Sequence, residues 1–121
     1  MSRDEASGRL DRIRDLNDRL RVDLLDGEWV LTAGIAGLDN ALALKVIHAV
    51  RTFDAFPSDD GSRDEHDFGA MQVDGVRVCW KIDCYDLDKR QASSDPADET
   101  RTLRVLTVML AEEFGGPAGR N

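Results

Sequence analysis

Long apolar segments are absent from this chain of 121 residues. No run approaches the roughly 20 consecutive apolar residues that a membrane-spanning helix needs. The N-terminal stretch MSRDEASGRL also lacks the apolar core of a secretion signal. These absences favour a cytoplasmic protein that makes no contact with a membrane. The length suits a single domain with one hydrophobic core, and we expect its ordered part to extend from residue 9 or so to residue 114.

Cysteine and histidine are scarce, with two residues of each. The odd spacing of Cys79 and Cys84 points their side chains to opposite faces of one strand, so we expect no disulfide between them. Two thiols do not complete a zinc site, and neither has an obvious catalytic triad. A phosphate-binding loop and the Gly-x-Ser-x-Gly motif of hydrolases are also absent. We therefore expect no cofactor and no bound metal.

The negative charge is concentrated in the middle of the chain. Residues 54–99 contain 13 acidic and 5 basic residues and account for the whole net charge of −8. The segments on either side are nearly neutral. A negative field repels nucleic-acid phosphates and attracts basic surfaces. We therefore expect a protein partner with a basic surface and no direct binding of nucleic acid.

The stretch from Asp64 to Asp88 predicts a β-hairpin. Asp74 and Gly75 form a two-residue turn signal between alternating apolar residues. With the turn there, Gly69 faces Trp80, and the missing side chain leaves room for the indole. One face of the hairpin collects the apolar residues Met71, Val73, Val76, Val78, Trp80, Ile82 and Cys84. The other face is half polar and half aromatic, with His66, Phe68, Gln72, Arg77, Cys79, Lys81, Asp83 and Tyr85.

The other segments predict three helices and one further strand. A helical period of apolar residues covers 9–25 and ends at Gly27, a β-rich run covers 28–33, and Gly34 to Gly37 form a loop. Asp39 or Asn40 caps a second helix that extends to residue 52. Asp95 caps a third, whose buried stripe is Leu103, Leu106, Thr107, Leu110 and Phe114. The predicted fold is α+β in the order α-β-α-β-β-α, with a three-stranded antiparallel sheet covered by helices on one face.

The best catalytic set lies at the open end of the hairpin. There His66 is expected to face Asp83, and such residues bind a divalent ion while Lys81 stabilises developing negative charge. The set of His66, Asp67, Lys81 and Asp83 is similar to that of metal-dependent nucleases, although the order Lys81-Ile82-Asp83 reverses their usual acid-x-Lys spacing. The structural alternative is a cross-strand pair of His66 and Asp83, with the other aspartates capping loops.

Several stretches resemble a small bacterial domain family of unknown function. They are LNDRLR, VLTAGI, AVRTFDAF, EHDFGAMQVDG, WKIDCYD and SSDPADETRTLRVLTVMLAEEF, and they cover most of residues 12–114. Cys84 stands where the resemblance leads us to expect an aromatic residue. The resemblance implies a protein of plasmids, integrated elements or phages, and it implies no chemistry.

Two classes of function follow. The first is a non-enzymatic acidic protein that inhibits a host defence against nucleic acids, such as a CRISPR or restriction complex. Its partner-binding carboxylates would be Asp59, Asp60, Asp64, Glu65, Asp67, Asp83, Asp86 and Asp88. The plain alternative is that these residues only keep the protein soluble. The second class is a metal-dependent hydrolase using His66, Asp67, Lys81 and Asp83. Phe56 and Phe68, in and beside the acidic loop expected at residues 54–64, suit either a homodimer or a partner contact.

Overall fold

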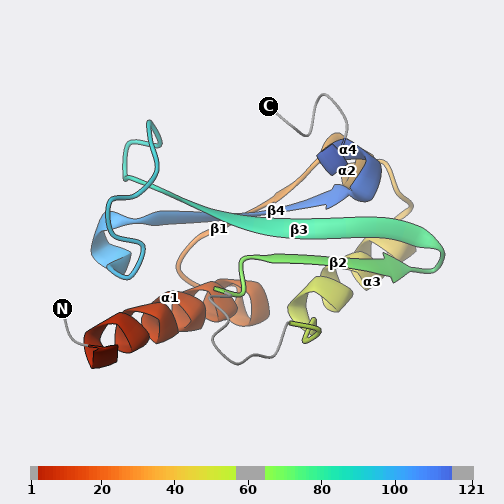
Figure 1. Cartoon of the computed structure of the whole chain (residues 1–121). Coiled ribbons are helices and arrows are strands. Elements are labelled where there is room, and N and C mark those ends of the chain that lie inside the picture. The colour runs from red at the N-terminus through yellow and green to blue at the C-terminus, as the bar shows by residue number, and fades with distance from the viewer. Residues whose placement is uncertain (1–2, 57–64, 116–121) are drawn as a thin grey trace.

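The computed structural model describes residues 3–56 and 65–115 (Figure 1). Its helices are α1 (Arg3–Asp23), α2 (Ala33–Ala36), α3 (Asn40–Arg51) and α4 (Ala111–Gly115), with a 3-10 turn η1 (Glu99–Arg101). Its strands are β1 (Glu28–Leu31), β2 (Phe68–Val73), β3 (Val76–Tyr85) and β4 (Leu103–Leu110). Of the predicted partner-binding residues, Asp59, Asp60 and Asp64 lie outside the described ranges.

The sheet differs from the predicted one. In the described part of the chain it has four strands in the order β1-β4-β3-β2. β1 pairs parallel to β4, whereas the other two pairs are antiparallel. The prediction of α+β was right in class, but the three-stranded antiparallel sheet was wrong, because a fourth strand lies between β1 and the hairpin.

That fourth strand is the segment predicted as the C-terminal helix. Residues 103–110 form β4, and only Ala111–Gly115 are helical. The apolar positions of LRVLTVML satisfy a helical stripe, but a short continuous apolar run fits a central strand equally well. Its β-branched Val105, Thr107 and Val108 favour the strand. β4 is hydrogen-bonded to a strand on both sides, and this pairing outweighs the helix-capping signal at Asp95. The Asp95 carboxylate caps no helix and accepts a hydrogen bond from Ala97 N–H at 3.3 Å.

The hairpin and its register are confirmed. Val73 pairs with Val76 and Gly69 with Trp80. Asp74 and Gly75 both have positive φ, 49° and 84°, as a two-residue turn of type I′ requires. A Cβ on Gly69 would lie 2.4 Å from Trp80 Nε1, so the glycine is needed for the indole to pack across the strand pair.

Two helices cover one face of the sheet. Figure 1 shows α1 and α3 below the strands, with α2 and α4 together near the end of β4. The core between these layers is built from residues that are almost fully buried, among them Leu16, Leu20, Ile35, Val46, Val50, Val78, Trp80, Leu106 and Val108. Alternation along β3 and β4 therefore leaves Lys81, Asp83 and Thr107 on the face away from α1 and α3.

The helix limits refine three expectations. Asp39 caps α3 as expected, because its carboxylate accepts from Leu42 N–H at 2.8 Å. α1 is already helical from Arg3 and ends at Asp23, where Leu24 adopts a positive φ of 59°, before the predicted stop at Gly27. The predicted loop at 34–37 is instead the short helix α2, which buries Ile35 completely.

Candidate functional site

His66 does not face Asp83 as predicted. It precedes β2 with a φ of 57°, which turns it out of the strand's alternation. Its Nδ1 lies 2.9 Å from Asp18 Oδ1 on α1, and its ring stacks on Phe56 at 3.7 Å between centroids. Asp83 instead forms an ion pair with Lys81, Nζ to Oδ2 at 3.0 Å. The imidazole thus lies on the helix side of the sheet and the Lys81–Asp83 pair on the other.

The four residues of the hydrolase hypothesis are therefore divided between two faces. Because a metal ion needs its ligands around one point, the separation of His66 from Asp83 removes the geometric basis of that set. Within residues 3–56 and 65–115, no group of three or more histidine, cysteine, aspartate or glutamate side chains is placed to hold a metal ion. In the same ranges, no helix is both long enough and apolar enough to cross a bilayer.

The segment before β2 is held against α1 by a set of contacts that we call the loop anchor, made of Asn17, Asp18, Phe56, Glu65 and His66. Asn17 Nδ2 donates to the carbonyl of Glu65 at 3.0 Å, and the next side chain on α1, Asp18, contacts His66. Phe56 stacks on the face of the imidazole. These three contacts hold residues 65 and 66 in place directly before β2, so the histidine here has a positioning role.

Arg21 extends the loop anchor into the core. Only 4% of its surface is exposed, and its Nη1 donates to the carbonyls of Val50, Arg51 and Phe53 at 3.0–3.1 Å. The C-terminal end of a helix attracts positive charge, so the guanidinium binds α1 to the end of α3. Its Nη2 lies 3.2 Å from Asp18, which therefore contacts both Arg21 and His66.

Arg104 is the second buried cation. It lies on β4 with 1% of its surface exposed, and its Nε donates to Asn17 Oδ1 at 2.8 Å. A second bond runs from Nη2 to the carbonyl of Pro96. Burial lowers the pKa of the Arg104 guanidinium. Asn17 is thereby bonded on one side to β4 and on the other to the segment before β2.

The sequence reasoning missed both buried arginines. Their signal was present, because Arg21 continues the helical spacing of the apolar residues Ile13, Leu16 and Leu20, and Arg104 interrupts an apolar run. A charged residue in an apolar pattern indicates a buried group with fixed partners.

The predicted acidic residues that the structure describes gather at the open end of the hairpin. Glu65 and Asp67 come directly before β2, and Asp83 lies near the end of β3. Burial raises the pKa of the Cys84 thiol beside them, Arg104 opposes this rise, and the carboxylates of Glu65, Asp67 and Asp83 add to it. The last two predicted acids, Asp86 and Asp88, follow directly after β3. Asp86 Oδ1 accepts from Arg90 N–H at 3.1 Å, which shapes the loop beyond the hairpin.

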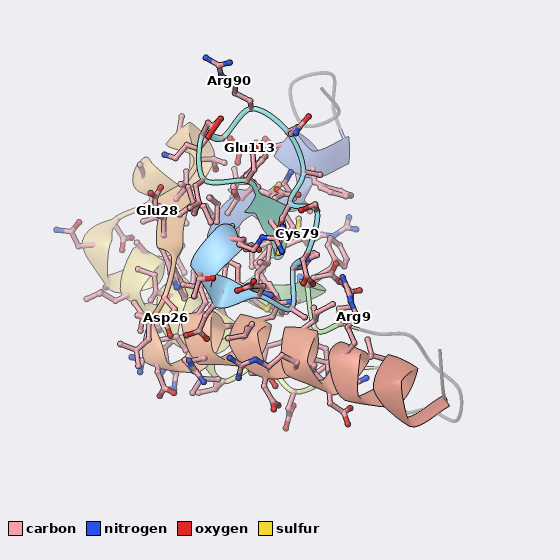
Figure 2. All side chains as sticks on the ribbon, turned by 90° about the vertical axis from the view of Figure 1, so that its left-hand side faces the viewer. Arg9, Asp26, Glu28, Cys79, Arg90 and Glu113 are labelled. Atoms are coloured by element: carbon pink, nitrogen blue, oxygen red, sulfur yellow. The ribbon has the colours of Figure 1, made fainter. Side chains whose placement is uncertain are left out.

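Among the residues that the structure describes, few basic groups lie at this end of the hairpin. Lys81 is paired with Asp83, and Lys89 lies 3.6 Å from Glu28. Figure 2 shows Arg90 extending outward from the loop after β3. Glu65, Asp67, Asp83, Asp86 and Asp88 thus make an acidic patch, which we call the hairpin-end patch. They outnumber the described bases near them, which are Lys81, Lys89, Arg90 and the buried Arg104. Such a patch can bind a basic surface through ion pairs.

A family model described as a protein of unknown function, DUF3768, matches residues 31–113, more than half of the chain. The chain belongs to this family. The match covers the hairpin and β4, and it begins after α1, so Asn17, Asp18 and Arg21 lie outside it. No curated protein and no solved structure matches the chain.

Proposed function

We propose that this DUF3768 protein is a non-enzymatic interaction protein whose hairpin-end patch binds a basic protein surface. The observation that carries the proposal is the gathering of five predicted acids at one end of the hairpin, in a chain whose net charge of −8 comes from residues 54–99. Opposite charges across an interface raise the association rate and fix the orientation of the partners.

The contacts of the loop anchor support this proposal. His66 is stacked and hydrogen-bonded on the helix side of the sheet, where it positions the segment carrying Glu65 and Asp67. A rigid support lowers the entropy lost when acidic side chains are ordered by a partner. The buried Arg21 and Arg104 therefore act on binding indirectly, by holding the framework of the hairpin-end patch.

We propose further that the partner is a nucleic-acid-binding complex of a host defence system, of the CRISPR or restriction type, and that binding takes place in the cytoplasm. Grooves that bind nucleic acid are lined with lysine and arginine, and a row of carboxylates competes for them with phosphates. The resemblance to a family of plasmids, integrated elements and phages favours this partner over other basic proteins.

A cleavage assay tests the proposal. Restriction and CRISPR nucleases from a bacterium that carries such plasmids or phages are incubated with DNA and increasing concentrations of this protein. The wild type is compared with the variant Asp83→Asn/Asp86→Asn/Asp88→Asn. The matched control, Asp11→Asn/Asp15→Asn/Asp23→Asn, removes the same charge from exposed positions of α1. We expect wild type and the control to inhibit at least one nuclease, and the hairpin variant to need about tenfold more protein. Equal inhibition by both variants, or none by wild type, would contradict the proposal.

A further inference from the structure

Among the described residues, β1 is an edge strand and forms one border of the sheet. The strand order ends there, and within that part of the chain β1 pairs only with β4 (Figure 1). Thr32 N–H donates to the carbonyl of Val108 at 3.1 Å, so residues 28, 30 and 32 turn their backbone groups toward β4. Directions alternate along a strand. Trp29 and Leu31 therefore turn their N–H and C=O groups outward, and nothing within residues 3–56 and 65–115 pairs with them.

Several exposed apolar side chains lie on β1 and in the segment directly before it. Leu24, Leu25, Val30 and Leu31 are each between 38% and 53% exposed, and all lie within eight residues of chain. The strand carries no lysine, proline or bulge, which are devices that keep edge strands from pairing. The border thus combines free backbone groups with apolar surface, as strands that pair with another chain do.

The charges beside β1 are already neutralised. Asp26 Oδ2 lies 2.9 Å from Arg19 Nη1, and Glu28 Oε2 lies 3.6 Å from Lys89 Nζ. Figure 2 shows Asp26 and Glu28 on the same side of the molecule, at the border. Although the whole chain is strongly acidic, these two ion pairs mean that Asp26 and Glu28 add no net charge where two copies meet here.

We propose that β1 pairs antiparallel with β1 of a second copy of this chain, about a two-fold axis at Val30. In this register Trp29 faces Leu31 of the second copy, and each pair exchanges two hydrogen bonds because both residues turn their backbone outward. Val30 faces Val30, and Glu28 faces Thr32, so no like charges lie opposite each other. A two-fold axis at Trp29 would instead place Gly27 opposite Leu31, and an axis at Leu31 would place Ala33 opposite Trp29. Gly27 and Ala33 both lie outside β1.

The second copy suits this border because the register centred on Val30 places apolar side chains opposite apolar side chains and no acid opposite an acid. Leu24 and Leu25 add exposed apolar area from each copy. The result is one continuous eight-stranded sheet that contains the hairpin-end patches of both copies. The existence of the dimer does not depend on what these patches bind.

Sedimentation velocity between about 1 μM and 1 mM protein tests the pairing. Wild type is expected to dimerise, and Val30→Lys to weaken the dimer by about tenfold or more, because two lysines then lie opposite each other at the axis. The matched control is Leu44→Lys, which adds the same charge at a side chain of α3 that is 66% exposed. A mixture of Val30→Lys and Val30→Asp should restore the dimer, because opposite charges then meet.

Amide exchange of wild type gives a readout that needs no substitution. The N–H groups of Trp29 and Leu31 should exchange more slowly as the protein concentration rises, whereas that of Val30, already directed at β4, should change less. A wild type that stays monomeric at the highest concentration overturns the proposal, as does equal dimerisation of Val30→Lys and Leu44→Lys. Amide exchange rates of Trp29 and Leu31 that do not depend on protein concentration overturn the proposal too. The edge of β1 would then be open to pairing with a different protein.

Discussion

Replacing Arg21 with methionine tests how the loop anchor is held. The substitution keeps an unbranched side chain of helix-forming type on α1 but removes the donors to the carbonyls of Val50, Arg51 and Phe53. Val50 retains Phe53 N–H as a donor at 3.3 Å, so two carbonyls are left without their bond from the guanidinium. Both lost bonds are part-buried and come from a charged donor, and such a hydrogen bond contributes about 1.5–3 kcal/mol. Attraction to the helix end adds up to about 1 kcal/mol.

Methionine carries no charge, so the variant no longer bears the free-energy cost of burying the guanidinium, and this offsets part of the lost stability. We therefore expect Arg21→Met to lower the free energy of unfolding by about 2–3 kcal/mol. Urea unfolding followed by circular dichroism measures it. The control is Arg12→Met, whose guanidinium is half exposed and pairs with Glu99 at 2.9 Å, and which should cost less than about 1 kcal/mol. Equal costs for the two variants would refute the role assigned to Arg21.

Three further outcomes follow from single contacts. Gly69→Ala should lower the unfolding free energy by about 2 kcal/mol or more, since its Cβ meets Trp80 Nε1 at 2.4 Å; a thermal midpoint unchanged from wild type would contradict this. The Thr32 hydroxyl lowers the pKa of Glu113, so this carboxylate stabilises the fold above its unfolded pKa of about 4.3, and the stability is lost as pH falls through the lower folded pKa. Glu113→Gln should flatten the acid limb of a stability–pH profile, and an unchanged limb would count against the contact. Burial raises the pKa of both Cys79 and Cys84, so a thiol reagent at neutral pH should react with them slowly until denaturant is added.

The hairpin was predictable because its signals are local. Asp74 and Gly75 favour positive φ through their own chemistry, and a two-residue turn then fixes the register that pairs Gly69 with Trp80. The cap at Asp39 is equally local, since donor and acceptor are three residues apart. Where neighbours in sequence decide the structure, the sequence suffices.

The last strand and the loop anchor depend on residues far apart in the chain. Residues 103–110 become a strand because β1 and β3 supply hydrogen bonds on both sides, which periodicity within the segment does not reveal. Likewise, the partner of His66 is Asp18, 48 positions earlier, and the partner of Arg104 is Asn17, 87 positions earlier. The pairing rule of an extended hairpin led instead to Asp83, because it assumed that the strand continues back to His66.

Mapping a basic probe onto the protein tests the central claim most directly. A nona-arginine peptide is titrated into isotopically labelled wild type, and amide chemical shifts are followed at low and at physiological salt. We predict that the shifts concentrate at residues 65–67 and 83–88 and weaken as salt rises, because ion pairs at an exposed patch are screened. Shifts that spread over α1, or that leave the hairpin-end patch unchanged, would contradict the account.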